Sequence, residues 1–96
     1  MIQSFADRAT QDLFEGADSK AARTFSRTLW PAIRRKLDGV SAAAAIQDLR
    51  VPPGNRLEAL KGAAAGRYSI RVNEQYRVTF RWEGGHAFEV RCEDYH

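Results

Sequence analysis

The stretch "YSIRVNEQYRVTFRW", residues 68–82, decides the fold, because its apolar residues recur at every second position. Tyr68, Ile70 and Val72 alternate with polar residues, and the alternation resumes at Tyr76 after the short link "NEQ". A period of two is typical of a strand with one buried face, and a link this short favours a hairpin. The stretch therefore predicts two antiparallel strands.

A third strand is expected directly downstream. Residues 88–93, "FEVRCE", follow the turn-like link "EGGH" and repeat the same alternation, which assigns Phe88, Val90 and Cys92 to the apolar face. The three strands form an antiparallel meander with one apolar and one arginine-rich face. The apolar face needs helices to cover it.

The chain upstream of the meander supplies those helices. Four apolar residues recur at intervals of four, four and three, which places them on one helical stripe: Leu29, Ile33, Leu37 and Val40. Pro31 is tolerated in a first turn, so the main helix is expected from about Thr28, a possible N-cap, to about Ala43. A short helix is expected over residues 6–16, ending at Gly16.

Less regular segments complete the prediction. Residues 1–5 are interpreted as a brief first strand, residues 17–28 as a loop or an extra helical turn, and "VPPGNR" as a sharp break. The expected fold class is α+β, with two or three N-terminal helices packed on a small antiparallel sheet that ends in the three-strand meander. Residues 1–96 are expected to form a single domain.

Composition narrows the class of protein. The 96 residues are 44% hydrophobic and 28% charged, with a single cysteine. That balance is typical of globular domains, and one cysteine excludes an internal disulfide or a cysteine-based zinc cluster. No segment resembles a signal peptide or an apolar membrane span, so we expect a cytoplasmic protein without membrane association.

Arginine dominates the basic residues. The net charge is +3, and twelve of the fifteen basic residues are arginine. The planar donor fork of arginine suits phosphate groups and stacks on bases, which favours a nucleic-acid partner. High-GC codon usage is the alternative explanation.

The polar sheet face is the candidate phosphate-binding surface. Its basic residues, with the lysine of the loop that leads into it, are Arg71, Arg77, Arg81, Arg91 and Lys61. Cross-strand neighbours lie about 5 Å apart, so these side chains can form one cationic surface. The alternative is a solvated face with local ion pairs, because Glu89 and Glu93 alternate on the same side.

The chain closes on "EDYH", residues 93–96, which concentrates acid–base groups. Metal-free RNA cleavage needs a base for the 2′-hydroxyl, an acid for the leaving oxygen and cations for the phosphorane. His96 suits either proton role, Tyr95 can stack on a base or donate, and Asp94 can orient an imidazole or accept a proton. A disordered tail is the alternative.

His86 is expected at the surface, and two histidines are too few for a metal site.

Four segments together carry a resemblance: "MIQSF", "PPGNRLEALKG" at 52–62, the stretch 68–82 and the terminal "EDYH". In this order they resemble the HigB-type toxins of the RelE superfamily of bacterial toxin–antitoxin systems, over essentially the whole chain. The resemblance implies a RelE-like fold and a ribosome-dependent endoribonuclease that cuts mRNA in the A site and inhibits translation. It also implies a helix-turn-helix antitoxin (HigA-like), through which alone operator DNA is bound. Because the RNA's own 2′-hydroxyl is the nucleophile, no metal or cofactor is implied.

The resemblance also implies roles for single residues. The terminal motif falls on Asp94, Tyr95 and His96, and the family's lysine and strand arginine fall on Lys61 and Arg77. Glu58 stands where many members have histidine, and Gln75 stands where many have asparagine.

A mechanism follows as an expectation. Lys61 and Arg77 hold the phosphate, His96 or Glu58 takes the 2′-hydroxyl proton, and Asp94 or His96 assists the leaving oxygen. Two other functions stay open: an RNA- or ribosome-binding inhibitor that does not cut, and a structural partner of a DNA-binding regulator.

Overall fold

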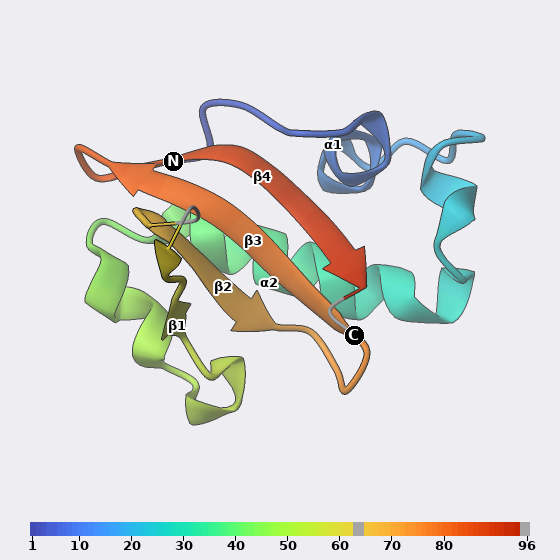
Figure 1. Cartoon of the computed structure of the whole chain (residues 1–96). Coiled ribbons are helices and arrows are strands. Elements are labelled where there is room, and N and C mark those ends of the chain that lie inside the picture. The colour runs from blue at the N-terminus through green and yellow to red at the C-terminus, as the bar shows by residue number, and fades with distance from the viewer. Residues whose placement is uncertain (63–64, 95–96) are drawn as a thin grey trace.

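The computed structural model describes residues 1–62 and 65–94. Its helices and strands are α1 (Arg8–Glu15), α2 (Trp30–Ala42), β1 (Glu58–Ala59), β2 (Arg67–Arg71), β3 (Tyr76–Glu83) and β4 (His86–Asp94). Short 3-10 turns cover Ala22–Thr24, Arg27–Leu29, Ile46–Arg50 and Pro53–Asn55. The strands form one antiparallel sheet in the order β1-β2-β3-β4 (Figure 1). The predicted α+β class and the three-strand meander are confirmed.

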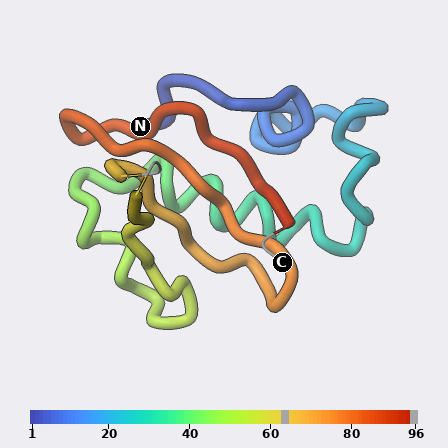
Figure 2. Tube along the Cα trace, in the orientation of Figure 1, coloured from blue at the N-terminus to red at the C-terminus, as the bar shows by residue number. Residues whose placement is uncertain are grey.

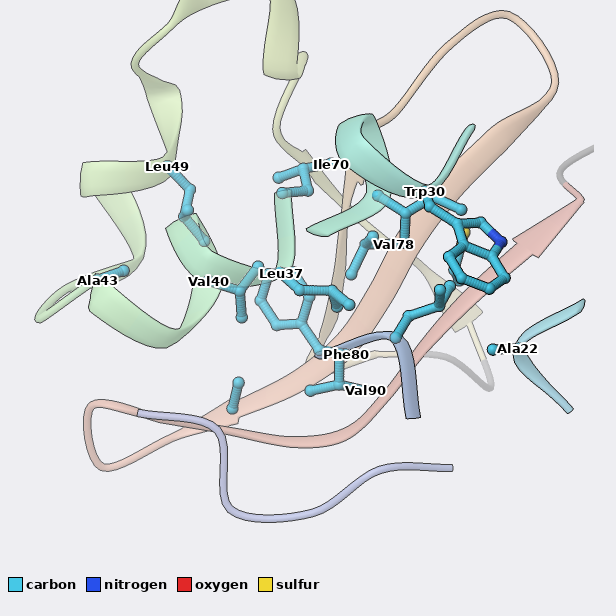
Figure 3. Packing of buried hydrophobic residues seen from close by; sticks show 14 residues of the cluster. Ala22, Trp30, Leu37, Val40, Ala43, Leu49, Ile70, Val78, Phe80 and Val90 are labelled. Carbon is cyan, nitrogen blue, oxygen red and sulfur yellow. The ribbon is translucent and has the colours of Figure 1, made fainter. Parts of the chain in front are cut away.

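The sheet is covered on one side. Helix α2 crosses behind it and α1 lies beside β4, while the opposite face carries no helix (Figure 1). Leu37 and Val40 of α2 pack near Phe80, Val78 and Ile70 of the sheet (Figure 3). All five side chains are fully buried, and burial of each such side chain contributes roughly 1.5–3 kcal/mol. This single core fixes the sheet on the helices.

The ends of the helices follow from local chemistry. The Asp7 side chain accepts a 2.8 Å hydrogen bond from the Thr10 amide, and Gly16 ends α1 at φ +79. Helix α2 begins at Trp30, with Pro31 in its first turn, and ends at Ala42. The prediction that Thr28 caps this helix is wrong, because Thr28 lies inside the 3-10 turn that precedes it.

The N-terminal segment follows the outer edge of β4 (Figure 2). Ile2 and Phe5 make isolated parallel bridges to Ala87 and Val90, so residues 1–5 pair with the sheet without forming a continuous strand. The Gln3 amide donates to the Ala87 carbonyl at 2.8 Å. The expected first strand is thus reduced to two bridges that cover the edge of the sheet.

A β-bulge interrupts the last hairpin. Thr79 pairs with Arg91, whereas Arg81 pairs with Phe88, so β4 has one extra residue between them. Glu89 lies at this point with φ +54. The bulge reverses the alternation, and Phe88 shares the polar face with Arg81. The assignment of Phe88 to the apolar face is therefore wrong.

Strand β1 pairs with β2 from within a segment in which no strand was expected. Among the described residues, no helix is long and apolar enough to cross a bilayer.

Candidate functional site

Two neighbouring rows of residues cross the helix-free face of the sheet. One row pairs Glu58 of β1, Ser69 of β2, Thr79 of β3 and Arg91 of β4, and the next pairs Arg71, Arg77 and Glu93. Directly paired residues project from the same face of a sheet. The short strand β1 thus brings Glu58 into one patch of the sheet. The other residues of this patch are Ser69, Arg71, Arg77, Thr79 and Glu93.

Arg77 is the best-fixed cation of this patch. Its Nε donates to the Ser69 hydroxyl at 2.8 Å, and its Nη2 donates to the carbonyl of Arg56 at 2.7 Å. The side chain is only 11% exposed, and Nη2 lies 3.5 Å from Oε2 of Glu58. A guanidinium held by such contacts is pre-organised to meet an anion.

Small side chains make room for this arrangement. Ser69 is fully buried and Thr79 is 3% exposed, although both lie on the face without helices. The Thr79 hydroxyl donates to Glu93 at 2.6 Å, as the Ser69 hydroxyl accepts from Arg77. These two positions form the floor of the patch, over which the longer side chains extend.

The carboxylate of the patch is positioned by the turn that precedes β1. The Pro53–Asn55 turn ends at Arg56, whose φ of +46 redirects the chain into β1. Glu58 then pairs with Ser69, and its side chain is 57% exposed. Lys61 follows two residues after β1 and is exposed, with no hydrogen bond or ion pair to the rest of the described chain.

The four arginines of the predicted surface divide into two groups. Arg71 lies directly opposite Arg77 and donates from Nε to the Asn73 carbonyl at 3.1 Å. Arg81 contacts Glu83 and Glu89, and Arg91 lies within 4 Å of Asp7 and Glu93.

Arg81 and Arg91 are therefore engaged in ion pairs with neighbouring carboxylates. At the other end of the face, Arg71 and Arg77 lie directly opposite each other, and with Lys61 the basic side chains outnumber the carboxylates of Glu58 and Glu93 by one. Like charges in direct opposition repel, so a bound anion would stabilise this end.

The terminal motif is described only in part. Tyr95 and His96 lie outside the described residues, so their predicted roles stay predictions. Asp94 pairs with Tyr76 and accepts a 3.0 Å hydrogen bond from the side-chain amide of Gln75. Strand alternation places Asp94 on the same side as Cys92, two residues earlier, rather than on the side of Arg77.

The remaining candidates have structural roles. Cys92 lies in the core, and burial raises the pKa of its thiol to about 12, which keeps it protonated. His86 is exposed, with Nδ1 3.2 Å from the side-chain amide of Gln3. No group of three potential metal ligands lies together within the described part of the chain.

The structure thus assembles a carboxylate and two arginines, with a lysine at the same sheet edge. A carboxylate can accept a proton, and a fixed guanidinium can stabilise charge that develops on a phosphate. Sequence patterns placed the arginines on one face but missed Ser69 and the Arg56 carbonyl as the groups that hold Arg77. No pattern within one segment of the sequence identifies these two groups, because their contacts with Arg77 depend on how β1 and β3 flank β2.

Comparisons with known proteins identify the family of this chain. A family model described as the RelE-like toxin of the type II toxin–antitoxin system HigB matches residues 3–96. The chain is 44% identical over 90 residues to "Toxin HigB-1" of Vibrio cholerae, covering 94% of this chain and 93% of that protein. It is 34% identical over 98 residues to "Endoribonuclease HigB" of Proteus vulgaris, covering both chains completely.

The fold is also found in solved structures. A chain of the YoeB-YefM complex from Staphylococcus aureus superimposes with a TM-score of 0.61 at 16% identity, covering 100% of this chain and 98% of that one. At this identity the likeness shows the fold alone, which agrees with the family match. The chain therefore belongs to the HigB-like family of RelE-like toxins of type II toxin–antitoxin systems.

Proposed function

We propose that the chain is an endoribonuclease toxin that cuts mRNA in the ribosomal A site and thereby inhibits translation. The observation that carries this proposal is the Arg77 guanidinium, held by Ser69 and Arg56 beside the carboxylate of Glu58 on the uncovered face. The name of the relative from Proteus vulgaris, an endoribonuclease, supports the same activity.

The reaction is an internal displacement on one phosphodiester. A base removes the 2′-hydroxyl proton, the 2′-oxygen forms a bond to phosphorus, and the bond from phosphorus to the 5′-oxygen breaks. An acid protonates that leaving oxygen, which gives a 2′,3′-cyclic phosphate and a 5′-hydroxyl. The nucleophile belongs to the RNA, so this route requires no metal or other cofactor.

The residues divide these tasks as follows. Arg77 and Lys61 hold the phosphate and stabilise the charge of the phosphorane, with Arg71 close by. Glu58 or His96 takes the 2′-hydroxyl proton, and Asp94 or His96 gives a proton to the leaving 5′-oxygen. Tyr95 positions the nucleotide.

The ribosome completes the site by ordering the substrate. The described patch offers one firmly held cation and one exposed carboxylate, and nothing in it encloses a nucleotide. Fixing the message in a reactive geometry can supply a large part of the barrier reduction. Free RNA is therefore a poor substrate under this proposal.

The partner under this proposal is an antitoxin. A similar solved structure from Staphylococcus aureus is a heterotetrameric complex of the YoeB-YefM toxin-antitoxin, which supports an antitoxin partner for this chain. We infer a HigA-like helix-turn-helix protein that binds the toxin and provides the only contact with operator DNA. The toxin acts in the cytoplasm, where ribosomes and mRNA are found.

Mapping of mRNA 5′ ends after controlled expression tests the activity. Wild-type protein should create new 5′-hydroxyl ends within coding regions, and Arg77→Ala should remove them. Arg23→Ala is the matched control, because Arg23 is an exposed arginine that pairs with Asp18 far from the patch.

Two outcomes would contradict the proposal. Growth arrest without new ends would favour the inhibitor that binds without cutting. If the protein neither arrested growth nor associated with ribosomes, this result would favour a structural partner of a DNA-binding regulator.

A further inference from the structure

Phe88 is placed unlike the other aromatic residues. The aromatic residues that the structure describes lie in the core or in the layer packed against it, with Phe88 as the exception. Its half-buried ring lies on the helix-free face of the sheet, opposite Arg81. An apolar ring there does not contribute to the core and needs another explanation.

The ring forms a layered pair with Arg81. The guanidinium carbon of Arg81 lies 4.6 Å from the centroid of the Phe88 ring, and the arginine side chain is 37% exposed. Glu83 and Glu89 both contact this guanidinium and restrict its orientation. Single-stranded RNA is commonly bound by stacking of its bases on aromatic rings and on arginine planes.

A strained residue creates this placement. Glu89 has φ +54, a conformation that costs a residue with a side chain of the order of 1–3 kcal/mol. Its amide donates to the Ser4 hydroxyl at 2.9 Å, which helps to hold the bulge. Without the bulge, the alternation of β4 would turn Phe88 toward the core side, together with Val90. The strained conformation of Glu89 therefore accompanies the placement of the Phe88 ring beside Arg81 on the helix-free face.

The local charge favours a base over a phosphate. Arg67 and Arg81 lie opposite each other, and Glu89 bridges them through Oε1 at 2.9 and 3.6 Å. With Glu83 included, two arginines and two glutamates give this end of the face no net formal charge. A neutral, planar surface suits a nucleobase. The Arg71 and Arg77 end suits a phosphate, because with Lys61 it has three basic side chains against the two carboxylates of Glu58 and Glu93.

The two ends are separated by a length that RNA can span. Arg77 and Arg81 are four residues apart on β3, which is about 13 Å along an extended strand. A stacked strand advances about 3.4 Å per nucleotide and an unstacked one advances further, so this length corresponds to roughly two to four nucleotides.

We propose that Phe88 and Arg81 form a stacking platform for a nucleobase of single-stranded mRNA, two to four nucleotides from the phosphate held at Arg77. This inference rests on the proposed RNA-cleaving function and adds to it a second contact that fixes the register of the message. The platform touches the substrate but not the reacting bond. It therefore affects binding and the choice of cleavage position rather than the chemical step.

A fluorescent message tests the platform independently of cleavage. Ribosomes are programmed with an mRNA that carries 2′-deoxyribose at the cleavage nucleotide, which prevents the reaction, and 2-aminopurine at single positions two to four nucleotides to either side. Wild-type protein and Phe88→Tyr should quench the fluorescence at one of these positions, because stacking quenches 2-aminopurine. Phe88→Leu, which keeps apolar volume without a ring, should not quench it.

An all-ribose message gives the matching kinetic result. Phe88→Leu should raise KM by roughly 5- to 150-fold, the effect of losing one stacked base, with kcat nearly unchanged. Thermal melting verifies that the variant folds, and Arg81→Leu serves as a second variant, because it removes the guanidinium and keeps the ring.

The outcomes separate the two proposals. Full cleavage and quenching by both Phe88→Leu and Arg81→Leu would overturn the platform and leave the proposed function intact. If the wild-type protein quenched at one position but did not cleave the all-ribose message, the proposed nuclease activity would be wrong and the stacking platform would be supported.

Discussion

Replacing Glu58 by glutamine tests the proton-transfer step most directly. The amide has nearly the same shape as the carboxylate but cannot accept the 2′-hydroxyl proton. Glu58 is 57% exposed, and its ion pair with Arg77 spans 3.5 Å, so the change should alter the free energy of unfolding by at most about 1 kcal/mol. Arg77 keeps its hydrogen bonds to Ser69 and Arg56, because neither involves Glu58.

The expected effect on activity is much larger. Loss of a positioned general base lowers a rate by about 10²- to 10⁴-fold, so kcat on ribosome-bound message should fall by this factor with KM nearly unchanged. The assay is single-turnover cleavage of a 5′-labelled mRNA on programmed ribosomes. Aspartate at this position is the companion variant, since it keeps a carboxylate but shortens the side chain.

Substitution by histidine adds a pH-dependent result. The resemblance to the HigB-type toxins implies histidine at this place in many members, and an imidazole titrates near neutrality. The rate of the Glu58→His variant should therefore rise with pH through this range, because only the neutral imidazole accepts a proton. If Glu58→Gln cut the message at the wild-type rate, the carboxylate would have no part in proton transfer and the assignment to Glu58 would be wrong.

Three further outcomes are expected. Asp7→Ala removes the side chain that caps α1 at the Thr10 amide, and thermal unfolding should show a loss of about 1 kcal/mol, or about 4–8 °C in Tm for a domain of this size; an unchanged Tm would contradict the capping role. Cys92 should resist thiol reagents at pH 8 in the folded protein, since burial raises the pKa of its thiol to about 12 and the reactive thiolate is scarce below that pH; rapid labelling without denaturant would refute this. Deletion of His96 should strongly reduce mRNA cutting after controlled expression without lowering Tm, and cutting at full strength would exclude the terminal imidazole from the mechanism.

Much of the fold was determined by the sequence alone. The period-two pattern from Tyr68 onward specifies the strands of the meander, and the Leu29 to Val40 stripe specifies α2, because both patterns are local consequences of backbone geometry. Gly16 ended the first helix as expected. The arginines were also placed correctly on one face, since alternation is preserved along β2 and β3.

Tertiary structure decided the features that make the site specific. Strand β1 has only two residues, and they become a strand only by pairing with β2, which brings Glu58 within 3.5 Å of Arg77. The bulge at Glu89 is a property of the register between β3 and β4, and it alone turned Phe88 onto the polar face. A pattern read along one chain segment reports which residues alternate, but cross-strand register is set by contacts between segments far apart in sequence. For this reason the sequence could predict the sheet, while only the folded chain shows which side chains meet on it.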